Sequence, residues 1–169
     1  MLRSLDGKKP RIAESAFISE TAYIVGDVEI GEDSSVWPGA VIRADFSSIK
    51  IGKKVHVEDN VVLHSGLAPV TIGDDVIMGH GAIVHAEKVG HNVLIGANAT
   101  ILHDVEIGDF CIIAGGAVVP ERMKIPDGSF VVGVPAEVRG KASAKQLTWV
   151  KQGPSTYSEL AHKYKEQGL

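Results

Sequence analysis

The feature that most constrains the fold of this chain is an aliphatic residue that recurs about every six residues, often with glycine after it. A period of six cannot keep one face of an α-helix apolar, whereas short strands separated by turns can repeat in this way. The repeating units open at Ile24, Ile30, Val36, Ile42, Ile51, Val57, Leu63, Ile72, Met78, Val84, Val89, Ile95, Ile101, Ile107, Ile113, Val119, Ile125 and Val131. The repeat therefore predicts an all-β solenoid rather than a β-sandwich, in which strand spacing is less regular.

Three such units make one triangular coil, and stacked coils share a continuous core. The opening residue points inward, and the residue four places later is small or apolar in most units. We expect these residues to be buried: Val28, Ala40, Val55, Val61, Ala82, Val93, Ala99, Cys111 and Ala117. The units that open at Ile42 and Leu63 have nine residues, and we expect their extra residues to bulge out as loops without changing the register.

The chain of 169 residues is expected to form one domain with two parts. The solenoid occupies residues 1–141, with an irregular cap up to about residue 23. Residues 142–169 form a helical segment that packs along the outside of the solenoid. Gly153-Pro154 is expected to break this segment into two helical pieces, and Leu160 and Tyr164 give the second piece a narrow apolar stripe.

Composition excludes several classes of partner. The formal net charge is −4 and no basic tract is present, which disfavours nucleic acid. No apolar run has the length of a signal peptide or of a membrane span, so we expect a cytoplasmic protein without a membrane partner. The single cysteine, Cys111, cannot form a disulfide within the chain, which fits a reducing compartment.

Two histidines share a column on the predicted solenoid. If the three faces are called a, b and c, with the Ile24 unit on face a, then Arg43, His64 and His85 each follow the opener of a face-a unit by one residue. Neighbouring strands lie about 4.8 Å apart. The imidazoles of His64 and His85 can therefore reach one metal ion from adjacent turns.

His80 follows its opener by two residues, on face c near the corner that leads to face a. A histidine there meets His64 and His85 most easily if it comes from a neighbouring chain, and rotation by 120° closes such a ring. Three neutral imidazoles suit Zn²⁺, Co²⁺ or Fe²⁺ and leave room for water, whose pKa falls to about 7 on the metal. Taken singly, each histidine is more simply a surface residue, and that interpretation is retained for His56, His91, His103 and His162.

Four stretches of the chain resemble the gamma-class carbonic anhydrases: VIRADFSSIKIG, DNVVLH, GHGAIVH and VVGVPAEVRG. The resemblance covers nearly the whole chain from about Pro10 and implies a left-handed parallel β-helix. It also implies a homotrimer with one metal per interface, held by His64 and His85 of one subunit and His80 of the next. The implied reaction is reversible hydration of CO2 to bicarbonate by a metal-bound hydroxide.

The resemblance assigns further residues to the site. Arg43 and Asp45 match an Arg-x-Asp pair that forms an intersubunit ion pair in the family, and Asp59 matches an acidic residue five places before the first metal histidine. Tyr157 resembles a family tyrosine near the site.

Two positions depart from the family pattern. Glu58 stands where the family commonly has glutamine, and it is expected to hydrogen-bond the water. Phe46 replaces a glutamate that shuttles protons in the archetype, and the archetype's acidic loop is replaced by SGLAPVT. His56 is then the candidate proton relay.

Two other functions remain open from the sequence. Acyltransferases and thioesterases that use coenzyme A share the repeat but usually employ one interface histidine, so metal content separates them from the anhydrase hypothesis. The third hypothesis is a metal-binding scaffold with little catalytic activity, which turnover of the fully loaded protein would separate. The native metal, the physiological substrate and the proton shuttle do not follow from the sequence.

Overall fold

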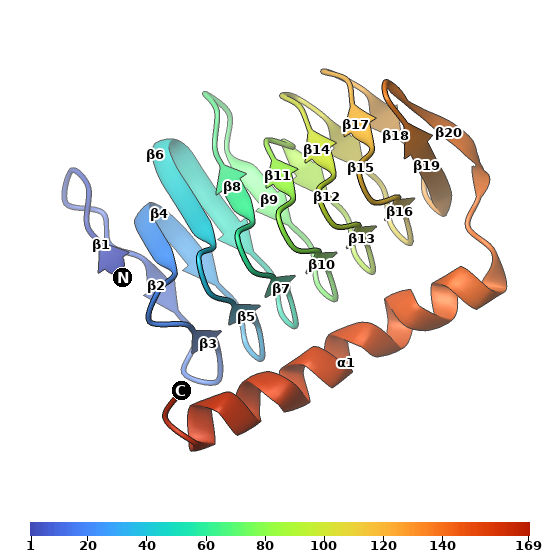
Figure 1. Cartoon of the computed structure of the whole chain (residues 1–169). Coiled ribbons are helices and arrows are strands. Elements are labelled where there is room, and N and C mark those ends of the chain that lie inside the picture. Colours follow the sequence, from blue (N-terminus) through green and yellow to red (C-terminus); the bar gives the residue numbers. More distant parts are fainter.

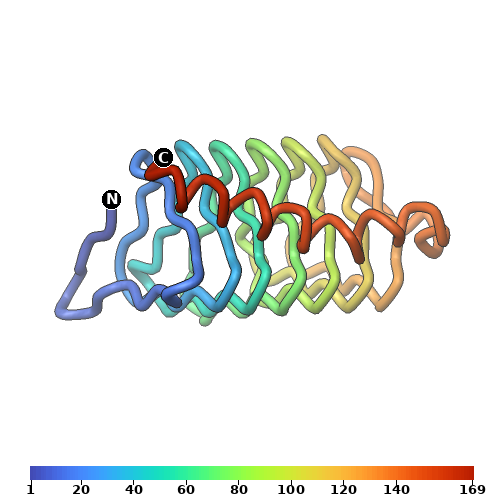
Figure 2. The backbone as a smooth tube through the Cα atoms, turned by 90° about the horizontal axis from the view of Figure 1, so that it is seen from below, coloured from blue at the N-terminus to red at the C-terminus, as the bar shows by residue number.

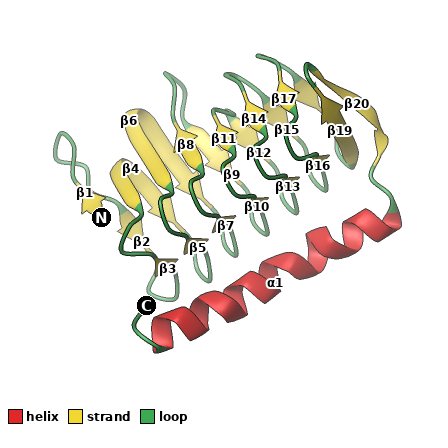
Figure 3. Ribbon diagram, in the orientation of Figure 1, coloured by secondary structure: helices red, strands yellow, loops and turns green.

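The computed structural model describes residues 1–169 as a parallel β-solenoid of about 7 turns with a single helix along its side (Figure 1). The strands are short and the turns between them occupy much of the coil (Figure 3). The predicted solenoid is therefore confirmed. The one helix lacks the combination of length and apolarity that a membrane-spanning helix needs.

The strands fall on three faces. Face a holds β1 (Leu2–Arg3), the first part of β4 (Tyr23–Ile30), the first part of β6 (Val41–Ile51), β8 (Val62–His64), β11 (Ile83–Val84), β14 (Thr100–Ile101) and β17 (Val118–Val119). Face b holds β2 (Arg11–Ile12), the later parts of β4 and β6, β9 (Val70–Ile72), β12 (Lys88–Val89), β15 (Glu106–Ile107) and β18 (Lys124–Ile125). Face c holds β3 (Phe17–Ile18), β5 (Ser35–Val36), β7 (His56–Val57), β10 (Ile77–Met78), β13 (Leu94–Ile95), β16 (Ile112–Ile113) and β19 (Ser129–Gly133), which pairs antiparallel with β20 (Ala136–Lys141).

The unit openers form the core in the predicted register. On face a, Ile24 pairs with Ile42 and Ile42 with Leu63, and all three side chains are fully buried. The inward residues at the corners, including Cys111, are buried as well. Burial of β-branched and other aliphatic side chains in continuous columns is the main force that holds the coils together.

Stacked corners require glycine where backbone and side chains approach closely. Gly39 has a φ of 72°, and a Cβ added there would lie 2.3 Å from Oδ1 of Asn60 on the next coil. Asn60 itself adopts φ 58°, a conformation that asparagine tolerates better than most residues. The corner between faces c and a is therefore fixed tightly, just before the coil that carries His80.

The helix α1 (Ala144–Glu166) lies along face c, where it contacts β3, β5, β7 and β10 (Figure 2). Ser143 caps it and forms a capping box with Gln146. The outward residues that face c presents in register are Phe17, Ser35, His56, Ile77, Leu94, Ile112 and Phe130. Most of this column is apolar, so a covering helix removes it from water.

The expected break at Gly153-Pro154 was wrong, because α1 runs through both residues. Proline inside a helix costs about 3 kcal/mol, since it removes one hydrogen bond and crowds the preceding turn. Both residues are buried against the solenoid, and a Cβ at Gly153 would lie 2.8 Å from Cδ1 of Ile77. Close packing between helix and sheet thus outweighs the local preference.

Two other details differ from the sequence-based expectation. Regular pairing starts well before residue 23, because β2 pairs with β4 and β3 with β5. Of the two nine-residue units, the first continues as the unbroken strand β6, and only the second forms a loop between β8 and β9.

Candidate functional site

The predicted histidine column is present at the corner between faces a and b. Arg43 pairs in register with His64, and the His64 and His85 rings lie 4.9 Å apart between centroids, at 88° to each other. Adjacent rungs of the parallel sheet impose this spacing. The two imidazoles are therefore close enough to share one ligand.

His64 is buried and makes a polar contact with Asp45. Its Nε2 lies 2.8 Å from Oδ1 of Asp45, while Arg43 binds the other oxygen of the same carboxylate. Burial raises the pKa of Asp45, but hydrogen bonds from His64 and Arg43 outweigh it and lower the pKa overall. An ionised carboxylate thus stands beside the histidine column, where it favours a cation. Arg43 and Asp45, expected to pair between subunits, already pair within one chain.

His85 has one ring nitrogen without a partner. Its Nδ1 is buried and makes no hydrogen bond. It is the only buried side-chain nitrogen or oxygen of the chain that lacks a hydrogen-bond partner. Burial, then the nearby His103, His64 and Arg43, lower the pKa of His85, which favours the neutral ring. A neutral imidazole with an unpartnered nitrogen is the form in which histidine binds metals.

Two aromatic rings flank the pair. His103, which the sequence placed among the solvated histidines, has its ring centroid 4.4 Å from that of His85. It lies on the next coil and follows the opener Ile101 by two residues instead of one, which is why the column count missed it. Phe46 lies edge-on to His64 at 5.9 Å and is 66% exposed.

His80 lies at the corner between faces c and a, held by two carboxylates. Its backbone N–H donates to Oε2 of Glu58 at 3.0 Å, and its Nε2 is 3.0 Å from the same oxygen. Its Nδ1 lies 2.9 Å from Oδ2 of Asp59. His80 is largely exposed whereas Glu58 is buried, so the imidazole projects outward from a buried carboxylate.

Tyr157 reaches this corner from α1. Burial, followed by a hydrogen bond to Glu58, raises the pKa of its phenol, which therefore stays protonated. A cavity of about 220 Å³ opens here, between α1 and the corner that carries His80. Its lining includes Trp37, Glu58, Asp59, His80, Tyr157 and Tyr164. The predicted residues Glu58, Asp59 and Tyr157 are thus brought together around His80.

His56 lies where a proton relay does not fit. The ring is fully buried, with Nδ1 2.7 Å from Oγ of Ser35 and Nε2 2.7 Å from the carbonyl oxygen of Pro154. Burial lowers its pKa to about 4, more than the hydrogen bond to Pro154 raises it. A ring with both nitrogens engaged and no contact with water has no route by which to pass a proton to solvent.

The three histidines predicted to bind a metal lie at two separate places in the chain. His80 and His85 stand at opposite corners of face a, with the strand β11 between them. No group of three or more His, Cys, Asp or Glu side chains within the chain is placed to hold a metal ion. A three-histidine site therefore needs a second chain to bring His80 to the column.

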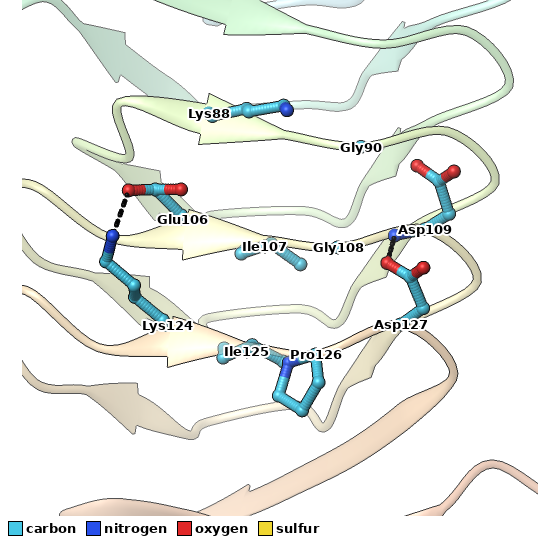
Figure 4. A pocket seen from close by; sticks show the side chains of 10 residues that line it. All are labelled: Lys88, Gly90, Glu106, Ile107, Gly108, Asp109, Lys124, Ile125, Pro126 and Asp127. Atoms are coloured by element: carbon cyan, nitrogen blue, oxygen red, sulfur yellow. Dashed lines mark hydrogen bonds and ion pairs between the residues drawn. The ribbon is translucent and has the colours of Figure 1, made fainter.

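The remaining histidines lie elsewhere. His91 contacts Asp74 at the corner between faces b and c, and His162 on α1 contacts Asp33. A larger groove of about 490 Å³ crosses face b, but it contains no histidine (Figure 4). There Lys124 pairs with Glu106 at 2.9 Å, and the Asp127 carboxylate accepts from the backbone N–H of Asp109 at 2.8 Å.

The chain is similar to a described protein family and to two proteins named as carbonic anhydrases. Residues 9–44 and 88–121 match the family described as bacterial transferase hexapeptide (six repeats). The chain is 41% identical over 151 residues to a probable carbonic anhydrase of Methanocaldococcus jannaschii, covering 89% of this chain and 95% of that protein. It is 32% identical over 167 residues to the mitochondrial gamma carbonic anhydrase 2 of Arabidopsis thaliana, covering 95% of this chain. The chain spans 60% of the length of that plant relative.

Among solved structures, a putative acetyltransferase of Bacillus cereus superposes with a TM-score of 0.94 at 36% identity. The alignment covers 98% of this chain and 97% of that one. The likeness therefore extends over the solenoid and the helix together.

Proposed function

This chain belongs to the gamma carbonic anhydrase family, and from that membership we propose that it binds a metal ion between subunits and catalyses reversible hydration of CO2 to bicarbonate. The observation that carries the proposal is the pair of edge-to-face imidazoles at one corner of face a, one with an unpartnered buried nitrogen. The third imidazole stands at the opposite corner of the same face, as an intersubunit site requires.

The residues that would hold the metal are His64 and His85 of one subunit and His80 of its neighbour. The donor set fits: the neutral His85 ring has a nitrogen to spare, and the Asp45 carboxylate adds negative charge beside His64. Three imidazoles suit Zn²⁺, with Fe²⁺ or Co²⁺ as alternatives. When bound, such a metal supplies Lewis acidity, which lowers the pKa of a coordinated water to about 7.

Asp59 would orient His80 toward the neighbour. A carboxylate on Nδ1 fixes the tautomer of a metal-binding histidine and leaves Nε2 for the metal. In the single chain, Nε2 of His80 contacts Glu58 instead. If Nε2 of His80 leaves Glu58 and binds at the neighbour's metal site, the side-chain carboxylate of Glu58 becomes free to accept a hydrogen bond from water.

Glu58 is the group proposed to accept a hydrogen bond from the reacting water. It is buried, and its carboxylate is held by the backbone N–H of His80. The protonated phenol of Tyr157 lies beside Glu58 in the cavity that both residues line. These contacts fix the acceptor before substrate arrives, which lowers the reorganisation that the reaction requires.

Arg43 and Asp45 are proposed to position His64 and to contribute to the subunit interface. Within the chain, Asp45 bridges the guanidinium of Arg43 and the His64 ring. The Arg43 side chain is 43% exposed, so it can also reach across an interface. An ion pair between exposed groups is worth at most about 1 kcal/mol. Burial by a neighbour strengthens the attraction between the charges but adds a desolvation cost, so the pair contributes more to the geometry of the interface than to its stability.

A homotrimer is proposed because face a carries an apolar stripe that nothing in the chain covers. The outward residues of face a are Tyr23, Val41, Val62, Ile83, Thr100 and Val118. Those of face b are mainly charged: Arg11, Glu29, Lys50, Thr71, Lys88, Glu106 and Lys124. Face c is covered by α1. Association through face a buries the stripe and joins the two half-sites.

A cytoplasmic location is part of the proposal, supported by the free, buried Cys111. The test is anaerobic purification with metal analysis per subunit, followed by a stopped-flow assay of CO2 hydration. One metal per subunit with hydration above that of the metal-free protein supports the enzyme. Full loading without turnover would instead indicate a metal-binding scaffold.

A second candidate is an acyltransferase or thioesterase that uses coenzyme A, favoured by the likeness to a structure named as a putative acetyltransferase. Such an enzyme needs a histidine base but no metal. Metal-free protein that transfers an acyl group from acetyl-coenzyme A, with the His85→Ala variant inactive, would favour this candidate. Acyl transfer that persists after the metal is removed, together with no CO2 hydration by the metal-loaded protein, would exclude the anhydrase.

A further inference from the structure

We propose that His56 is a positioning residue, which fastens the middle of α1 to face c through the Pro154 carbonyl and thereby holds Tyr157 against Glu58. Only the last link, from Glu58 to the metal site, rests on the proposed function. The attachment of the helix stands on contacts within the chain.

The tautomer of His56 follows from its partners. Nε2 faces a carbonyl oxygen, which only accepts, so Nε2 must carry the proton and donate it to Pro154. In the neutral ring Nδ1 is then an acceptor, and the Ser35 hydroxyl donates to it across 2.7 Å. Both nitrogens are satisfied in one tautomer only.

The orientation of the ring is fixed from the solenoid side. Ser35 lies one coil before His56 in register, and its oxygen accepts a hydrogen bond from Nε1 of Trp37 at 2.7 Å. Trp37, Ser35, His56 and Pro154 thus form a directional chain of three hydrogen bonds. Because every donor in it has one acceptor, the His56 ring cannot flip without leaving a buried group unpaired.

The helix side of the contact lies one turn before Tyr157. Residues three apart lie on the same side of a helix, so Pro154 and Tyr157 both lie on the side of α1 that packs against face c. The Tyr157 ring stacks on the His56 ring with centroids 5.4 Å apart and planes at 29°. His56 therefore contacts α1 twice, once through the backbone and once through the residue that enters the candidate site.

On the solenoid, His56 is also linked to the candidate site, through Glu58. His56 and Glu58 are two residues apart around the inward-pointing Val57, so both side chains point outward, toward α1. Glu58 in turn holds His80 by its backbone N–H. A shift of α1 at Pro154 would move Tyr157 away from Glu58 and loosen the carboxylate that holds the backbone of His80.

Other contacts hold a different part of the helix. Ser158 donates to the carbonyl of Asp33 at 2.8 Å, and Tyr164 packs edge-on against Phe17 and Trp37. These contacts lie from residue 158 onward, whereas before it Tyr157 also packs edge-on against Trp37 at 6.4 Å. Loss of His56 should therefore loosen the part of α1 before Ser158 without detaching its end.

The test compares His56→Asn with His56→Gln in the full-length protein. The Asn side chain reaches the position of Nδ1 and can still bond Ser35, but it falls short of Pro154. The Gln side chain reaches the position of Nε2 and keeps a donor for Pro154. Native-state hydrogen exchange of the amides in residues 150–157 is the first readout, with residues 159–166 and the solenoid strands as internal references.

We expect His56→Asn to speed exchange in residues 150–157 by about tenfold, as loss of one buried hydrogen bond implies, and His56→Gln to restore most of the protection. The second readout is Zn²⁺ affinity, measured by chelator competition. His56→Asn and Tyr157→Phe should each weaken it by about tenfold, and the double variant by no more than either.

Unchanged exchange in His56→Asn would overturn the proposal, as would equal loss in the Asn and Gln variants. Additive losses of Zn²⁺ affinity would show that His56 does not act through Tyr157, which also overturns it. If the parent protein binds no metal, the proposed function fails, but the exchange comparison still decides whether His56 holds the helix.

Discussion

The rings of His64 and His85 lie edge to face on neighbouring turns with centroids 4.9 Å apart, and only the His64 ring makes a hydrogen bond within the chain. His64 contacts Asp45, whereas Nδ1 of His85 has no partner. Under the proposed function these two rings are one half of an intersubunit metal site, and the imidazole that would complete it, His80, stands at the far corner of face a.

Removal of either column histidine should strip the metal. We expect His64→Ala and His85→Ala to lose most bound Zn²⁺ on dialysis, because two imidazoles hold zinc far more weakly than three. His91→Ala is the matched control, since that ring lies at another corner beside Asp74. The measurement is metal per subunit by mass spectrometry of the elements. Retention of one metal per subunit in both column variants would contradict the assignment.

Replacement of Glu58 by Gln should preserve the metal site. Gln keeps an oxygen that can accept from the His80 backbone and removes a charge that repels bicarbonate. We expect Glu58→Gln to keep its metal, to bind bicarbonate more tightly and to hydrate CO2 no more slowly than the parent. Stopped-flow hydration and bicarbonate titration measure this. A fall of about 10²–10⁴-fold in rate with metal retained would instead make Glu58 an essential base.

Stability should fall in acid through His56. The pKa of this residue is about 4 in the folded chain and 6.5 in the reference state, because burial disfavours the charged ring. Between these values the unfolded chain binds a proton that the folded chain rejects. Stability from this group is therefore complete above pH 6.5 and falls by up to about 3 kcal/mol as pH decreases toward 4.

Urea unfolding of the parent and of His56→Gln, at neutral pH and at about pH 5, isolates this contribution. The parent should lose more stability between the two conditions than the variant, measured at equal protein concentration. Equal losses would show that His56 does not titrate as its burial requires.

A charge on face a should dissociate the assembly without unfolding the coil. Ile83 points outward from the middle of the apolar stripe and is 40% exposed in the single chain. Ile83→Glu should lower the mass in light scattering to that of a monomer and lower metal occupancy with it, while the circular dichroism spectrum stays unchanged. Thr71→Glu, on the charged face b, is the control. A trimer that survives Ile83→Glu would place the interface on another face.

The solenoid was predictable because every turn repeats the same pattern of an aliphatic residue about every six positions in the sequence. The three-column count placed Arg43 beside His64 in the observed register, and it located His80 on a different corner. The same periodicity says nothing about how side chains deviate from a column. His103 was missed for that reason, since its ring leans toward His85 from a position one residue out of register.

The helix was harder to predict because tertiary packing overrides its local sequence. Gly153 and Pro154 disfavour a helix in isolation, yet both are buried where α1 meets the solenoid. His56 was proposed as the proton relay after Phe46 was found in place of the archetype's proton-shuttle glutamate. A signal was available: Ser35 and His56 are adjacent polar residues in an otherwise apolar outward column, and buried polar groups in such a column need partners.

The most direct test of an intersubunit metal site is complementation between two variants that each lack one half of it. His80→Ala and His85→Ala should both purify without metal. If they are unfolded, mixed in equal amounts and refolded, each mixed trimer contains one interface with all three histidines. The mixture should then recover about one quarter of the parent's metal, while each variant refolded alone recovers none. A mixture that stays as metal-free as its components, beside a parent that reloads fully, would contradict the account.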